Sequence, residues 1–379
     1  MNSNKNTLPS SAYTAETPTV TKQRSSNLEL YRILCMVMIV AHHFVVNSGL
    51  TDGNGPLSTD PASLKSFYLE IFGAWGKTGI NCFLMITGYF MCTSKITLRK
   101  FAKLMGQIYL YDFIFFLIFC YAGFESLSPK RIFILVMPVW CFGDNFISCF
   151  IGFWLTIPFL NILVNNMTKR QHELLLLLTL TMYTLLSSIP GFNVAFNYAT
   201  WFVIIYFIAS YIRLYPNAML EKRKLWGWLT VILLLVTVLS FRIMRALIGY
   251  SYFFVVDCNK FFAVAIAVSS FLWFKNMNIK YSNVINAFGA GTFGVLLIHA
   301  NSDAMRQWLW KDTMDVVGHY SLPFGQLVLF SVGTVLAIFV ICNLIDQLRI
   351  ATLEKWLFRW YDNSNYIKRI SSRIESIQY

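Results

Sequence analysis

The sequence predicts an all-α fold, a polytopic bundle of transmembrane helices, and three observations support this prediction. Of the 379 residues, 56% are hydrophobic and only 13% are charged, and the mean hydropathy is +0.55. Soluble globular chains contain about 25% charged residues, so this chain has too few charges to cover the exterior of a soluble protein. The apolar runs at 231–240 and 328–342 are continuous rather than alternating, which excludes a transmembrane β-barrel.

The apolar segments predict about ten membrane spans, because a helix needs about 20 apolar residues to cross the hydrocarbon. No internal repeat and no separate soluble domain is predicted. Segment 131–142 is predicted to be a short interfacial piece that leads into the fourth span. In chain order, the predicted spans are 30–50, 70–93, 104–123, 143–165, 172–190, 199–214, 225–241, 256–274, 284–300 and 324–346.

Two flanking segments are predicted to lie outside the membrane domain, which takes in residues 29–346. Residues 1–28 are rich in Ser, Thr, Asn and Pro and lack apolar periodicity, which is typical of a disordered tail. Residues 347–379 are predicted to form a basic amphipathic tail that lies on the anionic lipid of the inner leaflet. The side chains that predict this helix are Trp356, Leu357, Trp360, Lys355, Arg359, Lys368 and Arg369.

The positive charge predicts the orientation of the chain. The net charge is +13, and with the N-terminus inside, 22 of the 31 lysines and arginines fall on the cytoplasmic side of the ten predicted spans. Cytoplasmic loops carry such an excess, so both termini are predicted to be cytoplasmic. Because the charge follows the loops, nucleic acid is not an expected partner. The eight cysteines show no CxxC pair or metal-like spacing, so no metal site is expected.

The first predicted span contains charged and titratable residues, which are costly within a membrane and often functional. Arg32 and His43 are eleven positions apart. They therefore lie on one helix face, with His43 about 16 Å further along the axis. Arg32 can hold an anionic group at the inner end, Glu29 can orient its guanidinium, and a neutral His43 can accept a proton from a hydroxyl. In a purely structural interpretation, Arg32 anchors the helix at the interface and His43 packs in a polar seam.

The same span carries a resemblance to a known family. Residues 27–44, NLELYRILCMVMIVAHHF, resemble the opening helix of the acyltransferase-3 family, bacterial membrane O-acyltransferases of glycans, whose Arg-x10-His signature falls on Arg32 and His43. INCFLMITGYF at 80–90 is similar to the family segment F-x-x-x-S-G-[FY], with Thr87 in place of Ser. Two later segments, 201–216 and 293–310, also look like spans of this family. The resemblance covers roughly residues 27–346.

The resemblance implies transfer of an acyl group, usually acetyl from cytoplasmic acetyl-CoA, to a hydroxyl of a surface polysaccharide or lipid-linked glycan at the bacterial cytoplasmic membrane. It implies an acid/base role for His43 and a donor-side role for Arg32. The basic R-x-x-R that members often carry after the second span has its nearest match at Lys100-x-x-Lys103. Together with Arg99 these cations suit the phosphates of CoA, and an ordinary positive-inside loop explains them nearly as well.

Further polar residues are candidates for the acceptor side. His299, at the outer end of the ninth span, is followed by Asn301 and Arg306. The family has a late His motif that this pattern resembles, and these residues are expected either to line the acceptor mouth or to close a helix end. Asp112 and Glu70 are expected to contact a substrate or to pair with an internal cation such as Lys77.

Two mechanisms and a second class of protein stay open from the sequence. His43 can deprotonate the acceptor hydroxyl, or it can carry the acyl group itself. A membrane transporter or exporter of a glycan or a related small molecule is the alternative, because intramembrane Arg and His also mark transport pathways. Transporters often have internal repeats and broken helices, and the sequence shows neither. A glycan polymerase is a third alternative, for which connections such as 51–69 are short.

Overall fold

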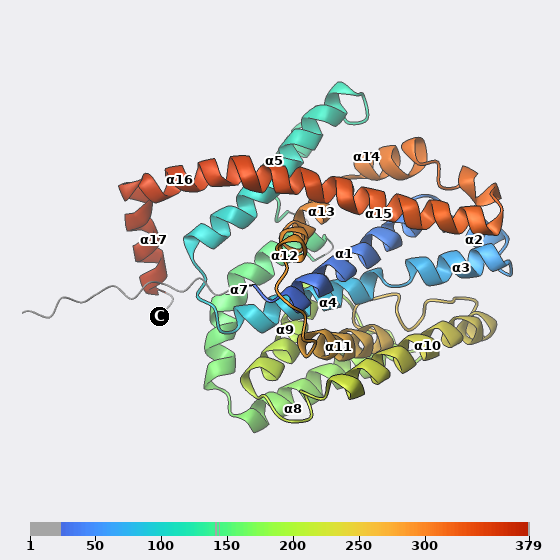
Figure 1. The fold of residues 1–379 in the computed structure, drawn as a ribbon, viewed down its shortest axis with the longest axis horizontal. Coiled ribbons are helices and arrows are strands. Elements are labelled where there is room, and N and C mark those ends of the chain that lie inside the picture. Colours follow the sequence, from blue (N-terminus) through green and yellow to red (C-terminus); the bar gives the residue numbers. More distant parts are fainter. Residues whose placement is uncertain (1–23, 141, 144, 378–379) are drawn as a thin grey trace, which may run out of the picture.

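A computed structural model describes residues 24–140, 142–143 and 145–377, and within these residues the chain forms helices and no strand (Figure 1). The all-α prediction is therefore confirmed. Most of the expected disordered tail, 1–28, lies outside the described residues. Its last residues open the first helix, which begins at Ser26.

The helices follow one another through the whole described chain, with short π- and 3₁₀-helical pieces labelled η. Their bounds are α1 Ser26–Val46, α2 Pro56–Thr59, α3 Leu64–Gly73, α4 Gly76–Met91, α5 Leu98–Tyr121, α6 Pro129–Val136, α7 Phe146–Asn166, α8 Lys169–Leu180, η1 Thr181–Leu185, η2 Leu186–Ser188, α9 Tyr198–Leu214, α10 Arg223–Ile248, α11 Phe261–Lys275, α12 Asn283–Ala290, α13 Thr292–His299, α14 Asp303–Arg306, η3 Gln307–Thr313, η4 Gly318–Ser321, α15 Phe324–Arg349, η5 Ile350–Glu354, α16 Lys355–Asn363 and α17 Asn365–Ile377.

Each of the ten predicted spans coincides with helical structure, and the second and ninth are divided into α3 with α4 and α12 with α13. Five helices are long and apolar enough to cross a membrane: α1, α5, α7, α10 and the continuous helix from 324 to 363. A sixth is obtained if 283–299 and 303–321, bent by 93°, form one span, and α9 and α11 are shorter apolar helices. The chain is thus a helical membrane protein, while ten crossings and cytoplasmic termini stay predictions.

Helices α1 and α4 form the centre of the bundle (Figure 1). They approach closely because glycines of α4 face α1: a β-carbon at Gly76 would lie 2.2 Å from the ring of His42, and one at Gly79 would lie 3.0 Å from the carbonyl oxygen of Cys35. Small residues permit this kind of contact between membrane helices. Helix α11 packs against α4, while α12 and α15 pack against α1. The close contact between α1 and α4 therefore limits the movement of polar side chains that lie between these two helices.

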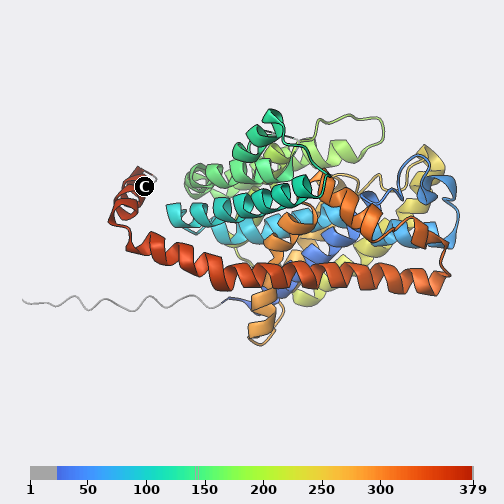
Figure 2. The ribbon, with the colours of Figure 1, turned by 90° about the horizontal axis from the view of Figure 1, so that it is seen from above.

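The predicted tail is continuous with the last span. Helix α15 passes through η5 into α16 as one 40-residue helix, 324–363, so the predicted boundary at 346 lies inside a helix. Figure 2 shows this helix along one side of the bundle, with α16 and α17 extending beyond the other helices. The side chains of Trp356 and Trp360 are 69% and 59% exposed. An exposed aromatic surface next to basic residues is consistent with contact with lipid, which stays a prediction.

The loops at the two ends of α1 are expected to face opposite sides of the membrane. At the first end, Asn27 Nδ2 donates to the carbonyls of Phe274 and Lys275, at 3.0 and 2.9 Å. At the other end, Lys65 Nζ donates to the carbonyl of Tyr320 at 3.0 Å. The ten-span prediction places segments 51–65 and 94–103 on opposite sides of the membrane. Single cysteines in the two segments, in a variant without native cysteines, should react with a membrane-impermeant maleimide from opposite sides. Labelling of both segments from the same side would contradict the ten-span topology.

Candidate active site

The imidazoles of His43 and His299 meet near the C-terminal end of α1, where His299 is fully buried and His43 is half-buried. His43 Nδ1 lies 2.9 Å from Nε2 of His299 on α13, and His299 Nδ1 lies 2.6 Å from the carbonyl oxygen of Val295. A carbonyl only accepts, so His299 Nδ1 carries the proton and its Nε2 is an acceptor. His43 Nδ1–H then donates to that acceptor, which leaves the lone pair of His43 Nε2 free. The geometry thus assigns the tautomer of both rings.

His43 lines a cavity of about 310 Å³ between α1, α4, α5, α7, α9, α13 and α14. The walls combine apolar side chains with an unusual number of polar ones for a membrane helix bundle. Such a concave site with a few polar groups is the usual form of a substrate pocket. The polar side chains in its lining are His42, His43, Asn47, Lys77, Asp112, Asn145, Tyr198, Asn301 and Arg306.

A second, more polar pocket of about 610 Å³ adjoins this cavity. The two share Asn145, Asn301 and Arg306 in their linings. The second pocket also contains the ion pair of Glu125 and Arg131, whose Oε2 and Nε atoms are 2.9 Å apart. Polar side chains therefore line adjacent pockets from the connection between α5 and α6 to His43.

Several buried polar atoms around the cavity have no hydrogen-bond partner among the described residues. They are Nδ2 of Asn47, Oδ1 of Asn301 and Nε of Arg306. The other ends of two of these side chains are anchored: Asn301 Nδ2 donates to Oδ1 of Asp112 at 2.9 Å, and Arg306 Nη1 donates to Asp303 at 2.8 Å. Buried polar groups normally find a partner, so the unpaired atoms favour a polar ligand in this cavity.

Arg32 lies apart from this cavity, near the N-terminal end of α1. Its Nη1 is 3.8 Å from Oε1 of Glu29, and Glu29 also pairs with Arg24 at 3.4 Å. A β-carbon at Gly289 would lie 2.4 Å from Glu29 Oε2, so α12 holds this carboxylate against α1. The innermost α1 residue in the cavity lining is Ile39, seven positions and about 10 Å from Arg32. The structure therefore places the two signature residues on one helix but not in one cavity.

The predicted donor-side cations are engaged by the C-terminal helices. Arg99 Nη2 lies 3.0 Å from Oδ2 of Asp362, and Lys103 forms an ion pair with Glu354. Lys100 Nζ donates to a backbone carbonyl five residues earlier, at 2.6 Å. Donor phosphates would therefore compete with two carboxylates for these cations. Sequence reasoning missed these pairs because their members are about 250 residues apart.

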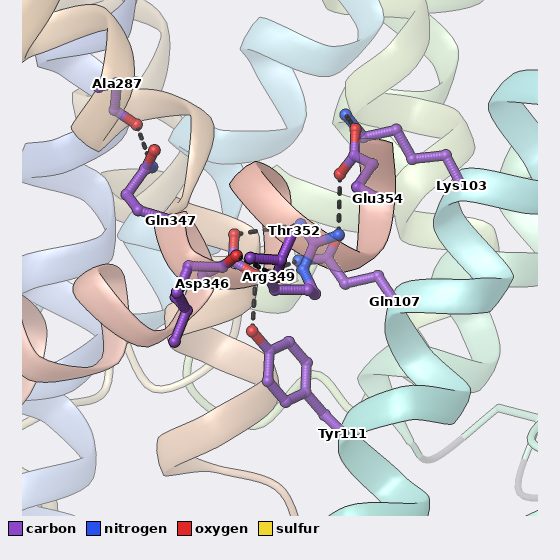
Figure 3. A network of polar contacts seen from close by, with 10 residues as sticks. Lys103, Gln107, Tyr111, Ala287, Asp346, Gln347, Arg349, Thr352 and Glu354 are labelled. Atoms are coloured by element: carbon purple, nitrogen blue, oxygen red, sulfur yellow. Dashed lines mark hydrogen bonds and ion pairs between the residues drawn. The ribbon is translucent and has the colours of Figure 1, made fainter. Parts of the chain in front are cut away.

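A buried polar network joins the same helices more deeply (Figure 3). Oδ1 of Asp346, which is fully buried, accepts hydrogen bonds from Tyr111 at 2.7 Å, from Gln107 at 3.1 Å and from Arg349 Nε at 2.7 Å. A β-carbon at Gly294 would lie 2.2 Å from Asp346 Cγ, so α13 also packs directly on this carboxylate. The network fixes α5 and α13, which contribute to the His43 cavity, to α15.

The structure also places the carboxylates that were expected to contact a substrate or to pair with a cation such as Lys77. Glu70 forms an ion pair with Arg245, and Asp112 binds Asn301, so neither carboxylate pairs with Lys77. Lys77 instead lines the His43 cavity and donates to the hydroxyl of Tyr198 at 2.6 Å. Its charge within a predicted span was the only sequence signal for this position.

Apolar helices around a polar, histidine-lined cavity define a membrane-embedded protein with an enzyme-like site. A family model described as an acyltransferase domain matches residues 25–343. The chain belongs to the acyltransferase-3 family and is a membrane acyltransferase, as the resemblance over residues 27–346 predicts. No curated protein and no solved structure matches the chain.

Proposed function

We propose that this acyltransferase transfers acetyl from cytoplasmic acetyl-CoA to a hydroxyl of a surface polysaccharide or lipid-linked glycan at the bacterial cytoplasmic membrane. The observation that carries the proposal is the free Nε2 of His43, which the hydrogen bond to His299 leaves unprotonated beside a polar cavity. The protein would cross the membrane ten times with both termini inside, in contact with the inner-leaflet lipid through α16 and α17.

In the proposed reaction, Nε2 of His43 takes the proton of the acceptor hydroxyl as its oxygen attacks the thioester carbonyl carbon. The carbon–sulfur bond then breaks, and the imidazolium returns the proton to the leaving thiolate. Throughout, His43 Nδ1–H donates to His299, which stabilises the imidazolium and holds the ring. The alternative, attack by Nε2 itself to give an acyl-enzyme, needs the same free nitrogen.

The acceptor is proposed to enter through the polar pocket next to the cavity. Asn301 and Arg306 present unpaired polar atoms there, and Asn145 belongs to both linings. A sugar offers many hydroxyls that donate and accept, so it suits mixed amide, carboxylate and guanidinium groups. His299 is buried behind His43 and is absent from the cavity lining. It therefore acts in this proposal as a positioning residue and not as a direct acceptor ligand.

On the donor side, we expect Arg32→Ala to raise KM for acetyl-CoA at least about 10-fold, because a hydrogen-bonded ion pair with a phosphate is worth about 1.5–3 kcal/mol. Arg32→Lys should restore part of the affinity, since lysine keeps the charge without the guanidinium fork. Arg24→Ala is the matched control, because Arg24 pairs with the same Glu29 but is more exposed. The measurement is thiol release from acetyl-CoA by the full chain in nanodiscs, and equal effects of the two alanine variants would contradict the assignment.

The function itself is tested by the acetyl content of the glycan made by cells with and without the protein. A transferase predicts that acetyl groups disappear while the amount of exported glycan stays unchanged. Loss of export with unchanged acetyl content would instead favour the alternative, a transporter of a glycan or related molecule.

A further inference from the structure

A lysine ammonium stands in the wall of the His43 cavity. Lys77 belongs to the first turn of α4 and follows Gly76, which contacts the ring of His42 on α1. Its Nζ donates to the hydroxyl of Tyr198 at 2.6 Å and lies 5.2 Å from the centre of that ring. The contact between α1 and α4 therefore places this cation on the same cavity as His43.

The partners of Lys77 do not account for its charge. Within the described part of the chain, no carboxylate lies within ion-pair distance of its Nζ, and Asp112, the carboxylate in the same cavity, binds Asn301. An ammonium has three N–H donors, and the bond to Tyr198 uses one. Asp257 acts on this ammonium electrostatically without forming an ion pair with it. A cation without a direct ion pair among membrane helices is costly, so a structural role alone would be better served by such a pair.

A second donor lies nearby. Asn47 follows His43 by one helical turn and lines the same cavity, and its buried Nδ2 has no hydrogen-bond partner within the part of the chain that the structure describes. Gly76, the first residue of α4, also lines the cavity, so the positive end of the α4 dipole contributes to the same wall. The Lys77 ammonium, Asn47 Nδ2 and the N-terminus of α4 thus make this wall favourable for negative charge. The free Nε2 of His43, which can take a proton, belongs to the same cavity.

We propose that Lys77 is a catalytic residue that stabilises the oxyanion formed during acyl transfer, with Asn47 Nδ2 as the second donor. This inference rests on the proposed function. When the acceptor oxygen bonds to the thioester carbon, the carbonyl electron pair moves to its oxygen, which accepts hydrogen bonds from both side chains. When this tetrahedral intermediate collapses, the carbonyl forms again and the thiolate leaves. The thiolate takes the proton from His43, so no further reactant is consumed. Tyr198 is the positioning residue that holds the ammonium.

The test uses the full chain in nanodiscs with acetyl-CoA as donor and glycerol as a hydroxyl probe, with thiol release as the signal. Lys77→Met is expected to lower kcat about 100-fold or more, as loss of one oxyanion donor does in other acyl transfers, with KM for acetyl-CoA changed less than about 3-fold. Lys77→Arg should restore part of kcat. Asn47→Leu should lower kcat about 10-fold and tests the same oxyanion independently if Lys77→Met does not fold.

The matched control is Lys260→Met. Lys260 is another partly buried lysine, and it donates to the carbonyl of Ser187 and lies 4.6 Å over the ring of Phe253. It is absent from the cavity lining, so its loss should leave kcat unchanged. An equal loss of kcat in this variant would overturn the inference, as would a rise in KM with unchanged kcat in Lys77→Met.

The outcomes separate this inference from the function on which it rests. If the wild type and His43→Ala release thiol at the same background rate, the proposed acyl transfer fails. If the wild type is active, His43→Ala is inactive and Lys77→Met and Asn47→Leu keep the wild-type kcat, only the oxyanion assignment fails.

Discussion

Replacing His43 with alanine should lower acetyl transfer about 1,000-fold or more, because a positioned acid–base group contributes about 100- to 10,000-fold. The free Nε2 of His43 is the only imidazole nitrogen in the His43–His299 pair without a hydrogen-bond partner in the described structure. The measurement is thiol release from acetyl-CoA, together with the acetyl content of the glycan, at matched protein levels in the membrane.

Two variants of His299 extend this prediction to the hydrogen bond behind the ring. His299→Leu removes the acceptor for His43 Nδ1–H and is expected to lower kcat about 10- to 100-fold, because the ring can then adopt the wrong tautomer. His299→Gln places an amide oxygen at a similar distance from the backbone and should recover part of that loss.

The control for these variants is His172→Ala. His172 is also fully buried, and its Nε2 lies 2.9 Å from the carbonyl of Phe207, away from the cavity. Its replacement should leave turnover per folded molecule unchanged. Full acetylation by His43→Ala would rule out the catalytic assignment, and equal activities of the Leu and Gln variants of His299 would rule out the tautomer argument.

Replacing Asp346 with leucine should lower the free energy of unfolding by about 3–5 kcal/mol, because it leaves a buried guanidinium without a main counterion. Arg349 is 8% exposed and donates to both carboxylate oxygens of Asp346, at 2.7 and 3.3 Å. The hydroxyl of Tyr111 and the amide of Gln107 lose their acceptor as well. The measurement is unfolding in mixed detergent micelles with increasing SDS, followed by tryptophan fluorescence.

The chain contains a matched pair for this experiment. Asp303 and Arg306 form an Asp–Arg ion pair with the same spacing along a helix, but the Asp303 side chain is 96% exposed. Exposed pairs are worth about 0–1 kcal/mol, so Asp303→Leu should change the free energy of unfolding by less than about 1 kcal/mol. If both variants lost the same stability, the network in Figure 3 would not be the structural link between α5 and α15.

The first helix shows which features of the site a sequence pattern predicts and which it does not. Helical geometry predicts that Arg32 and His43 share a face, and they do belong to one unbroken helix, α1. The pattern does not predict that the cavity ends at Ile39 and leaves Arg32 outside it. The length of a cavity depends on side chains from α4, α5, α9 and α13, whose packing no periodicity within α1 encodes.

The partners of the charged residues also could not be predicted from the spacing of residues within one helix. The cations at Arg99 and Lys103 could be predicted to lie together, because they are four positions apart on a helix. Their pairing with Asp362 and Glu354 could not be predicted, since it depends on where η5 and α16, which continue α15, lie relative to the start of α5. For the same reason, Asp112 was expected to contact a substrate or to pair with a cation such as Lys77, and it lines the same cavity as Lys77 but is bound by Asn301.

By itself, the sequence determined that the chain is helical, that it belongs in a membrane, and that Arg32 and His43 merit a role. These properties depend on local hydrogen bonds and on apolar content, both of which can be read along the chain. Only the tertiary structure decided which polar groups meet: His299 reaches His43 from 256 positions away, and Lys77 faces Tyr198 across the cavity. Such contacts are set by how distant helices pack, and helix packing follows the shape of whole surfaces rather than the spacing of residues within one segment.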